Sequence, residues 1–597
     1  MCGIFAYIGD RTNAQEIVLE GLKKLEYRGY DSWGIAHKRA DDQTIVLRKQ
    51  VGKIAEANPE LLNNKDETHF AIGHTRWATH GGVTNENAHP HASMNGKTIV
   101  IHNGIFENFQ ELKTFLIEQG YKFQSQTDTE VAAQLIQYEQ AQGLDFMQAI
   151  KSALKKLHGR YALIIMSSDH KQLVVARRGS PLIIGHNPET NEQFLASDVP
   201  AFLKYTNQVY YLDDEQMAIL EQDQAIKFFD LNTNSPIEKR LIQIDIQEEE
   251  AQKGDHPHFM IKEIWEQKET LLRAVNQDPA LIKNLATTID NAYGTYLIGC
   301  GTAGKVCLAA TYLFAKIAKK HINFAYGSEF LSFQDFIKPG SLLLAVSQSG
   351  ETADTLEAME IAKGKGAKLA AIINVESSTM GRLADLTIPI KAGPEKAVAS
   401  TKATTSQLAI LTLLAYSLAD ELEQGLELLI NTSSQINDML NPRYEEHIEA
   451  LARKIYTAES MYIIGKGVNY PMALEAAIKL QEVSYIHAEG FAGGELKHGP
   501  LALIDKGTPV IVLAAKDETY IDILNNAQEV KARGGYIIGV SPENQEIFDY
   551  WIRVPEVGHA SPIINIIPIQ ILSYHLALLK NNDPDKPRNL AKSVTVK

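Results

Sequence analysis

The sequence is poor in cysteine and carries no excess of basic residues. Its three cysteines, Cys2, Cys300 and Cys307, form no disulfide framework, which fits a reducing cytoplasm. The window that we identify as its most apolar long stretch, 408–419, is too short to span a bilayer, and the N-terminus lacks the regions of a signal peptide. A net charge of −15 argues against nucleic acid or an anionic membrane as the main partner. We therefore expect a soluble cytoplasmic protein.

Metal and nucleotide signatures are also missing. Five histidines lie between residues 74 and 102, but their spacing matches no zinc pattern such as HExxH, so a metal site is not expected. The Ser- and Gly-containing segment 347–352 is not followed by the Gly-Lys-Ser/Thr of a Walker loop. We interpret it as a sugar-phosphate site rather than a nucleotide site.

A chain of 597 residues is long enough for about three or four domains. Up to about Ile244 it shows short β-type runs and two helical patterns. The runs lie at 98–102, 161–166 and 173–176, and the helical patterns at 14–25 and 129–142. The acidic, polar segment 247–257 is typical of a linker. Beyond it, apolar strands alternate with Gly-rich turns and helices, which predicts α/β domains with parallel sheets.

The second part of the chain contains an internal repeat. Tyr296-Leu-Ile-Gly-Cys-Gly301 is echoed at 462–467, and the apolar run and Glu-Thr pair of 340–352 are echoed at 507–519 with nearly the same offset. Chance likeness between generic strand–helix units is the alternative. The preserved spacing favours two duplicated domains.

Cys2 becomes the first residue once Met1 is removed, so that its thiol and a free α-amino group lie on the same residue. A terminal amine titrates near ~8 and a thiol near ~8.5, so the amine can act as the base that a nucleophilic thiol requires. The alternative is that Cys2 is simply a small residue after an initiator methionine. The segments downstream favour a nucleophile.

Four downstream residues are suited to amide hydrolysis of an amino-acid substrate. Asn103 offers a side-chain NH2 and Gly104 a closely approaching backbone N–H for a developing oxyanion, although Asn-Gly is also a common tight-turn pair. Arg76 is suited to grip a carboxylate and Asp128 an ammonium group. Asp128 could instead cap the helix that begins there.

Together with 27–32, 73–80 and 89–91, these segments resemble the class II (Ntn-type) glutamine amidotransferase domain over about the first 240 residues. The resemblance implies an αββα sandwich. It also implies a nucleophile, Cys2, an oxyanion hole, Asn103 and Gly104, and glutamine-binding residues Arg76, Trp77 and Asp128. Trp33 departs from the family, whose Gly-Tyr-Asp-Ser motif is usually followed by alanine, and we expect this change to affect only local packing.

Two further segments point to a second site. The apolar strand 342–346 leads into Ser347-Gln-Ser-Gly-Glu-Thr352 and a helix from about Ala353, where hydroxyls and backbone N–H groups can bind an anion or merely cap the helix. A helix that begins at Pro471 presents Glu475, Lys479 and Glu482 on one face. A surface salt-bridge stripe is the alternative. The nearby loop 494–500, with an acid, a lysine and a histidine, favours a site.

The second part resembles the paired sugar isomerase (SIS) domains of the glutamine–fructose-6-phosphate aminotransferase family. The matching residues are 347–352, 398–403, 482–489, 495–500 and the tail 586–595. With the first domain, the resemblance spans essentially the full chain. It implies conversion of L-glutamine and D-fructose 6-phosphate to L-glutamate and D-glucosamine 6-phosphate, with internal ammonia transfer. It implies no metal, nucleotide or organic cofactor, and a homodimer.

The same resemblance gives roles to individual residues. Lys592 would form a Schiff base with the open-chain ketose, His498 would help to open the ring in its own or the neighbouring subunit's site, and Glu482 would move a proton between C1 and C2. The sugar phosphate would be bound by Thr302, Ser347, Gln348, Ser349, Thr352, Val398 and Ser400. One loop departs from the family: Cys-Gly-Thr-Ser-Tyr-His is usual, whereas this chain has Cys300-Gly-Thr-Ala-Gly-Lys305. Ala303 removes a hydroxyl near the phosphate, and Lys305 adds a cation that we expect to compensate.

We therefore predict a multidomain α/β and α+β chain. Its parts are an amidotransferase (Ntn) domain at 1–245, a linker at 246–262, SIS domains with doubly wound parallel sheets at 263–435 and 436–580, and a tail with the Schiff-base lysine at 581–597. An amidotransferase for another acceptor, such as a nucleotide precursor, is disfavoured because no pyrophosphatase or phosphoribosyl-pyrophosphate motif is found and Lys592 is present. A non-enzymatic sugar-phosphate sensor is disfavoured because Cys2, Glu482, His498 and Lys592 occur together.

Overall fold

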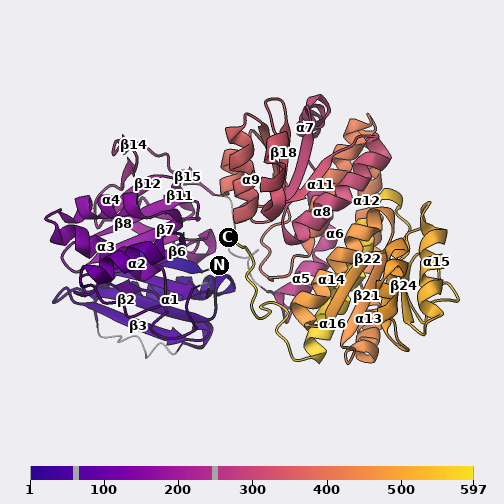
Figure 1. Cartoon of the computed structure of the whole chain (residues 1–597), viewed down its shortest axis with the longest axis horizontal. Coiled ribbons are helices and arrows are strands. Elements are labelled where there is room, and N and C mark those ends of the chain that lie inside the picture. Colours follow the sequence, from indigo (N-terminus) through magenta and orange to yellow (C-terminus); the bar gives the residue numbers. More distant parts are fainter. Residues whose placement is uncertain (1, 58–65, 79, 245–252, 596–597) are drawn as a thin grey trace. The chain divides into compact units, whose positions relative to one another are not determined.

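The computed structural model describes residues 2–57, 66–78, 80–244 and 253–595. The chain divides into two compact units (Figure 1). Unit 1 contains Met1–Gln252 and Ala591–Lys597, and unit 2 contains Lys253–Leu590. Part of the predicted linker, 246–252, lies outside the described residues.

Unit 1 is built on two antiparallel sheets. The first has the strand order β15 (Ile242–Gln243), β11 (Gln208–Tyr211), β9 (Ile183–Asn187), β10 (Glu192–Ala196), β1 (Gly3–Ile8), β4 (Thr68–Arg76), β2 (Ser32–Arg39) and β3 (Ile45–Val51). The second has the order β14 (Pro236–Ile237), β13 (Lys227–Asp230), β12 (Gln216–Glu221), β8 (Gln172–Arg178), β7 (Gly159–Ser167), β6 (Thr98–Phe106) and β5 (His91–Ala92). The β-type runs predicted at 98–102, 161–166 and 173–176 lie in β6, β7 and β8.

Helices cover the outer faces of these sheets, and apolar side chains fill the space between them. Ile4 and Ile72 from the first sheet meet Ile101 and Ile164 from the second in one buried cluster. On the outside, α1 (Ala14–Lys24) packs on the first sheet, and α3 (Thr129–Ala141) and α4 (Phe146–Lys156) cover the second, with α2 (Phe109–Glu118) beside α3. The predicted αββα sandwich is thus confirmed. The buried Trp33 belongs to the cluster under α1, so its departure from the family is accommodated by packing.

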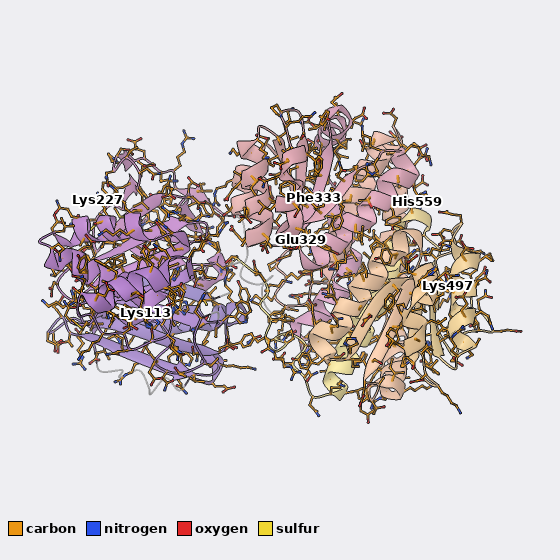
Figure 2. All side chains as sticks on the ribbon, viewed as in Figure 1. Lys113, Lys227, Glu329, Phe333, Lys497 and His559 are labelled. Carbon is orange, nitrogen blue, oxygen red and sulfur yellow. The ribbon has the colours of Figure 1, made fainter. Side chains whose placement is uncertain are left out.

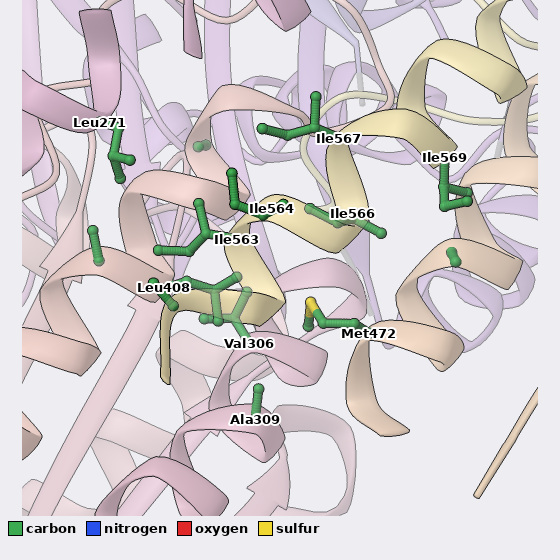
Figure 3. Close-up of a cluster of buried hydrophobic side chains, with 14 of the residues drawn as sticks. Leu271, Val306, Ala309, Leu408, Met472, Ile563, Ile564, Ile566, Ile567 and Ile569 are labelled. Carbon is green, nitrogen blue, oxygen red and sulfur yellow. The ribbon is translucent and has the colours of Figure 1, made fainter. Parts of the chain in front are cut away.

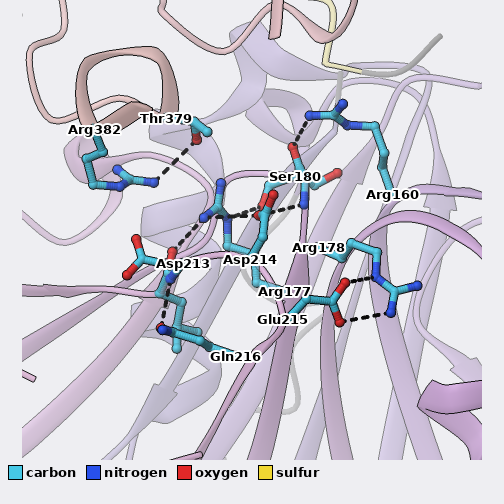
Figure 4. A network of polar contacts seen from close by, with 12 residues as sticks. Arg160, Arg177, Arg178, Ser180, Asp213, Asp214, Glu215, Gln216, Thr379 and Arg382 are labelled. Carbon is cyan, nitrogen blue, oxygen red and sulfur yellow. Dashed lines mark hydrogen bonds and ion pairs between the residues drawn. The ribbon is translucent and has the colours of Figure 1, made fainter. Parts of the chain in front are cut away.

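A buried arginine at the end of β8 fixes the connection to β12. The Arg177 guanidinium donates from Nε to the carbonyl oxygen of Ser180 at 2.8 Å and lies 3.3 Å from the Asp214 carboxylate (Figure 4). Arg178 pairs with Glu215 beside it. A buried guanidinium is tolerated only when its donors are satisfied. Both arginines therefore hold the loop before β12 against β8.

Unit 2 contains two parallel five-stranded sheets with the same strand order. The first is β17 (Asn323–Tyr326), β16 (Thr295–Gly299), β18 (Leu342–Ser347), β19 (Lys368–Ile373) and β20 (Leu386–Pro389). The second is β22 (His487–Ala492), β21 (Ser460–Gly465), β23 (Pro509–Leu513), β24 (Tyr536–Ser541) and β25 (Tyr550–Arg553). The order second, first, third, fourth, fifth is that of doubly wound sheets. The echoed segments at 296 and 462 start in the equivalent strands β16 and β21, which confirms the repeat.

Helices flank both sheets of unit 2. They are α5 (Phe259–Trp265), α6 (Gln267–Val275), α7 (Pro279–Asn291), α8 (Gly301–Leu313), α9 (Ala353–Gly364), α10 (Thr379–Leu383), α11 (Lys402–Leu418), α12 (Leu422–Met439), α13 (Pro442–Ile455), α14 (Tyr470–Ser484), α15 (Tyr520–Lys531) and α16 (Ser561–Leu579). One apolar cluster is shared by the two domains. Val306 on α8 and Leu408 on α11 belong to it together with Met472 on α14 and Ile564 on α16 (Figure 3).

The helix α16 is a second long apolar segment besides the predicted window 408–419. Among the described residues, the one helix long and apolar enough to cross a membrane is Gly558–Leu579, with a mean hydropathy of 1.6. Within this window, 89% of the residues are buried inside the protein, as expected for a core helix. The segment 408–419 lies mostly in α11, which is also buried.

Candidate active sites

The thiol of Cys2 lies beside the segment that follows β4. The Trp77 N–H donates to Cys2 Sγ at 3.2 Å. Gly29 lets this segment approach closely, since a Cβ there would lie 2.8 Å from the backbone of Arg76 and Trp77. The Asp31 N–H also donates to the Arg76 carbonyl at 3.0 Å. The Tyr-Arg-Gly-Tyr-Asp-Ser segment 27–32 therefore positions the backbone that faces the thiol.

Asn103 and Gly104 lie inside β6, so the tight-turn alternative is wrong. The Asn103 Nδ2 donates to the carbonyl oxygen of Cys2 at 2.8 Å. Gly104 has a φ of +137°, and a Cβ there would lie 1.9 Å from the carbonyl oxygen of Arg160 on β7. Only glycine fits such a position without moving the backbone. Asn103 thus contacts Cys2, and Gly104 lines the same pocket.

One pocket of unit 1 is lined by Cys2, Arg76, Trp77, Asn103, Gly104 and Asp128, together with His80, His89, His102, Thr127 and Thr129. The structure therefore brings together all six residues predicted for glutamine binding and hydrolysis. The other five were not predicted. The histidine-rich stretch and the Thr-Asp-Thr sequence contained the signal, since these segments carry the amidotransferase resemblance, but no role was predicted for these five side chains.

Arg76, at the end of β4, and Asp128, directly before α3, both line this pocket. The Arg76 guanidinium donates to the carbonyl oxygens of Gly82 at 3.0 Å and Gly81 at 3.2 Å, which hold it in place. Asp128 is the N-cap residue of α3, but its side chain makes no capping hydrogen bond. Its Oδ2 instead accepts from the Phe106 N–H at 2.8 Å. The capping alternative therefore does not describe this carboxylate.

The four histidines 74, 89, 91 and 102 are buried around this pocket. Burial lowers the pKa of His74 to about 3, and it lowers the pKa values of His89, His91 and His102 as well. The rings of His74 and His89 stack at a centroid distance of 4.1 Å. Within the described ranges, no group of three or more His, Cys, Asp or Glu side chains is arranged to hold a metal ion.

In unit 2, the segment 347–352 forms a turn between β18 and α9, as predicted. The Ser347 Oγ accepts from the Gly350 N–H at 3.0 Å, and the Ser349 Oγ accepts from the Glu351 N–H at 3.2 Å. Thr352 is the N-cap residue of α9 but makes no side-chain capping bond. The hydroxyls shape a turn that leads directly into the N-terminal end of α9.

Glu475, Lys479 and Glu482 lie on one face of α14, as predicted, but the surface-stripe alternative is wrong. Glu475 and Lys479 have 0% exposed side chains. The Lys479 Nζ lies 2.6 Å from the Glu482 carboxylate and 3.4 Å from that of Glu475. Burial raises the pKa of Glu475 to about 7. Burial alone would lower the pKa of Lys479, but the two carboxylates raise it overall, so the ammonium stays charged.

The first turn of α8 contacts this ionic cluster. The Thr302 Oγ1 donates to the Glu475 carboxylate at 3.0 Å, which links the two SIS domains. Lys305 lies on the same helix, with its Nζ 4.8 Å from the centre of the Tyr326 ring. Burial lowers the pKa of Lys305, and the carboxylates of Glu475 and Glu482 oppose this shift. The predicted phosphate contacts of Thr302 and Lys305 stay predictions.

The remaining predicted residues lie on loops. His498 is exposed at the end of the 3₁₀ helix Gly493–His498, next to Lys497, which lies on the surface (Figure 2). The Val398 N–H donates to the carbonyl oxygen of Asp585 at 3.0 Å, and the Ser400 hydroxyl donates to Glu395 at 3.2 Å. Gln348 belongs to the turn before α9.

The tail is attached to unit 2 near Glu482. The Arg588 N–H donates to the Tyr485 hydroxyl at 2.7 Å, and its guanidinium stacks over that ring at 4.3 Å. As predicted, the described part of the tail, 581–595, contains neither helix nor strand. Lys592 belongs to the last segment, which is grouped with unit 1. Its role stays a prediction.

The fold and the two sites define a class of protein. The glutamine amidotransferase domain family matches residues 33–228, and the SIS domain family matches twice, at 289–417 and 454–580. The chain is a glutamine amidotransferase domain joined to a pair of sugar isomerase domains.

Full-length relatives specify the family. A glutamine–fructose-6-phosphate aminotransferase [isomerizing] from Thermococcus kodakarensis is 44% identical over 608 residues, and one from Pyrococcus horikoshii is 42% identical over 604, each covering 100% of both chains. The solved C-terminal domain of glucosamine-fructose-6-phosphate aminotransferase from Francisella tularensis is 34% identical and covers 56% of this chain and 99% of that chain, with a TM-score of 0.52. The chain belongs to the glutamine–fructose-6-phosphate aminotransferase (isomerising) family.

Proposed function

We propose that this protein converts L-glutamine and D-fructose 6-phosphate to L-glutamate and D-glucosamine 6-phosphate, the first step of amino-sugar synthesis. One observation supports the proposal best. One chain contains both a thiol pocket with amide donors and a buried acid–base cluster on paired SIS domains. The same chain is similar along its whole length to glutamine–fructose-6-phosphate aminotransferases.

In the amidotransferase domain, Cys2 is the nucleophile. Its sulfur attacks the side-chain carbonyl carbon of glutamine, the C–N bond breaks, ammonia leaves, and water hydrolyses the thioester to glutamate. Burial raises the pKa of the Cys2 thiol, so a base must take its proton. The α-amine that Met1 removal leaves on Cys2 is that base, and it returns the proton to the leaving nitrogen.

The other pocket residues bind glutamine and stabilise the reaction's charge. The Asn103 side-chain NH2 and the Gly104 N–H stabilise the oxyanion, which typically contributes a factor of about 10²–10³ per donor in kcat. Arg76 binds the substrate carboxylate, and Asp128 binds its ammonium group. Trp77, whose N–H contacts the thiol, closes over the substrate.

In the SIS domains, the Lys592 amine condenses with the C2 carbonyl of the opened ketose and releases water. Ammonia produced at Cys2 then replaces the lysine nitrogen, and the Glu482 carboxylate carries a proton from C1 to C2 to give the aldose amine. His498 helps to open the sugar ring. The contact between Glu482 and the charged Lys479 supports a role for this carboxylate in proton transfer.

Chain length supports the role of Lys592. Arg588 is bound to Tyr485, three residues after Glu482. An extended chain spans at most about 3.6 Å per residue, so Lys592 lies within roughly 14 Å of Arg588. A tether of this length supports a role for Lys592 in the same reaction as Glu482.

The phosphate of the sugar binds at the turn before α9. Hydroxyls and backbone N–H groups at the N-terminus of this 12-residue helix suit an anion. We assign phosphate and sugar binding to Ser347, Gln348, Ser349, Thr352, Thr302, Val398 and Ser400.

The assembly and boundaries are proposed as follows. The protein forms a homodimer in the cytoplasm, and the exposed His498 serves the neighbouring subunit's site. The domains extend over 1–245, 263–435 and 436–580, with a linker at 246–262 and a tail at 581–597. No metal, nucleotide or organic cofactor takes part in the proposed reaction.

Product identification tests the proposal. With glutamine and fructose 6-phosphate together, mass spectrometry should find glucosamine 6-phosphate and glutamate in equal amounts. Glutamate without the amino sugar would favour an amidotransferase for another acceptor. Sugar-phosphate binding without turnover would favour a sensor.

Trapping with borohydride and fructose 6-phosphate tests the lysine. It should label Lys592 in the wild type and in the matched tail variant Lys586→Arg, but not in Lys592→Arg, because arginine stays protonated and forms no imine. A label on another residue would contradict the assignment.

A further inference from the structure

His74 bridges the two sheets of unit 1 next to the Cys2 pocket. It lies on β4 of the first sheet and has a fully buried side chain. Its Nε2 is 3.1 Å from the carbonyl oxygen of His102 and 3.1 Å from Asn103 Oδ1, both on β6 of the second sheet. The other ring nitrogen, Nδ1, has no hydrogen-bond partner among the described residues.

These contacts determine which nitrogen of His74 carries the proton. A backbone carbonyl oxygen can only accept, so the nitrogen 3.1 Å from the His102 oxygen must be the donor. His74 is neutral, because burial lowers its pKa to about 3. It therefore carries its single ring proton on Nε2.

The same proton determines how the Asn103 amide is turned. The atom of Asn103 that faces a donor must be its oxygen, which places the NH2 on the opposite side, toward Cys2. There the NH2 meets the carbonyl oxygen of Cys2 at 2.8 Å, a second acceptor. Two fixed carbonyl oxygens thus require the same orientation of one amide.

We propose that His74 is a positioning residue of the oxyanion hole: its Nε2–H holds Asn103 Oδ1 and keeps the Asn103 NH2 directed at the reacting carbonyl oxygen of the substrate. Without this bond, the amide can rotate and present its oxygen to the oxyanion, which is repulsive. The bond also polarises the amide and strengthens the NH2 as a donor. This inference rests on the proposed hydrolysis of glutamine at Cys2.

The test is a double-mutant cycle in the full-length protein with glutamine as substrate. His74→Phe keeps a ring that can stack on His89 but removes the donor. It should lower kcat 10- to 100-fold with KM within about twofold, less than the 10²–10³-fold loss expected when an oxyanion donor itself is removed. His74→Gln retains an N–H donor and should recover part of the loss. In the Asn103→Ala background, His74→Phe should have no further effect, because its target is gone.

A matched control is His91→Phe, since His91 is also buried but bonds to Thr127 rather than to Asn103. Any loss of kcat caused by His91→Phe should be independent of the loss caused by Asn103→Ala. The two fold-changes should therefore multiply in the double variant. The rate of Cys2 alkylation by iodoacetamide, which needs no oxyanion hole, should be unchanged in His74→Phe. Multiplicative effects of His74→Phe and Asn103→Ala, or alkylation that falls in parallel with kcat, would overturn the proposal.

A measurement on the wild type covers the case in which the variants do not fold. Nitrogen-15 NMR of histidine-labelled protein should show His74 protonated on Nε2 and unchanged between pH 5 and 8. Protonation on Nδ1 would refute the inference. If glutamine is not hydrolysed by the wild type, the proposed function fails, whereas the protonation result stands by itself.

Discussion

Glu475 illustrates how burial decides the charge of a single residue. The cluster on α14 contains two carboxylates and one ammonium, and Lys479 lies closer to Glu482 than to Glu475. The Oε2 of Glu475 is buried with no hydrogen-bond partner in the described part of the chain. A neutral cluster needs one protonated carboxyl, and Glu475 is the residue whose surroundings favour the proton.

Replacing the Glu475 carboxyl with an amide should increase stability by an amount that depends on pH. The folded-state pKa of Glu475 is about 7 against a usual value of 4.5, so the unfolded chain binds fewer protons between these values and stability falls as pH rises through that window. Glu475→Gln mimics the protonated form. Its melting temperature relative to wild type should rise from pH 5 to pH 8 and then level off, and the corresponding gain in the free energy of unfolding is at most roughly 3–4 kcal/mol. The exposed Glu459→Gln is the control; an offset for Glu475→Gln that is the same at every pH would contradict the argument.

Gly104 gives the second prediction for a single residue. Alanine at 104 must adopt a φ of +137° and push a Cβ against the Arg160 carbonyl. Gly104→Ala should shift β6 and reduce glutamine turnover by at least 10²-fold, the effect of losing one oxyanion donor. Gly120→Ala is a matched control, because its φ is +87° and its Cβ would meet nothing within 4 Å. Equal losses of turnover in both variants would show that backbone strain alone, rather than the collision at β7, is responsible.

At the level of elements, the sequence predicted most of what local patterns encode. The helices at 14–25 and 129–142 and the strands of the repeat were predicted because their apolar periodicity and Gly turns are local signals. The long apolar helix α16 was not predicted. It is buried on all sides, so its sequence has no polar face that marks it as a core helix.

The two sites show the same difference between what neighbouring residues encode and what contacts between elements determine. Spacing alone placed Glu475, Lys479 and Glu482 on one face of a helix, but it did not show that Thr302 from the other domain closes over them. Likewise, the role of His74 depends on contacts between two sheets, which no run of neighbouring residues encodes. The sequence predicts which residues share an element, whereas contacts between elements require the fold.

The histidines on and between β4, β5 and β6 predict an acid-sensitive amidotransferase domain. His74, His89, His91 and His102 are neutral when folded, because burial lowers each pKa, but an unfolded histidine takes up a proton below about pH 6.5. The unfolded chain thus binds more protons there, so stability falls as pH decreases below 6.5. Each histidine contributes up to about 1.4 kcal/mol per pH unit.

The measurement is the melting temperature of unit 1 between pH 7.5 and 5. Loss of glutaminase activity on heating reports the melting of this unit. The decline should be shallower in His91→Gln, which removes one buried imidazole, than in the exposed control His158→Gln. If His91→Gln loses stability equally at every pH, protonation on unfolding is not the cause.

At the level of the whole molecule, the two units should unfold separately while the two SIS domains unfold together. The shared cluster of unit 2 contains residues from both parallel sheets, such as Leu344 on β18 and Ile511 on β23, and it is joined by Ile564 on α16 (Figure 3). Domains that share one core cannot lose it independently. The clusters of unit 1 contain no residue of these sheets.

A pair of core truncations tests this expectation. Ile564→Ala removes a fully buried side chain of unit 2, and Ile150→Ala removes one of unit 1 on α4. Each should cost about 2–5 kcal/mol. In scanning calorimetry, Ile564→Ala should lower one transition by several degrees and leave heat inactivation of glutamine hydrolysis unchanged, because the truncated core does not support the Cys2 pocket. Ile150→Ala should lower the temperature at which glutamine hydrolysis is lost and leave the transition of unit 2 unchanged. A separate transition for each SIS domain, or a parallel shift of all transitions in either variant, would show that cooperativity follows other boundaries than these buried clusters.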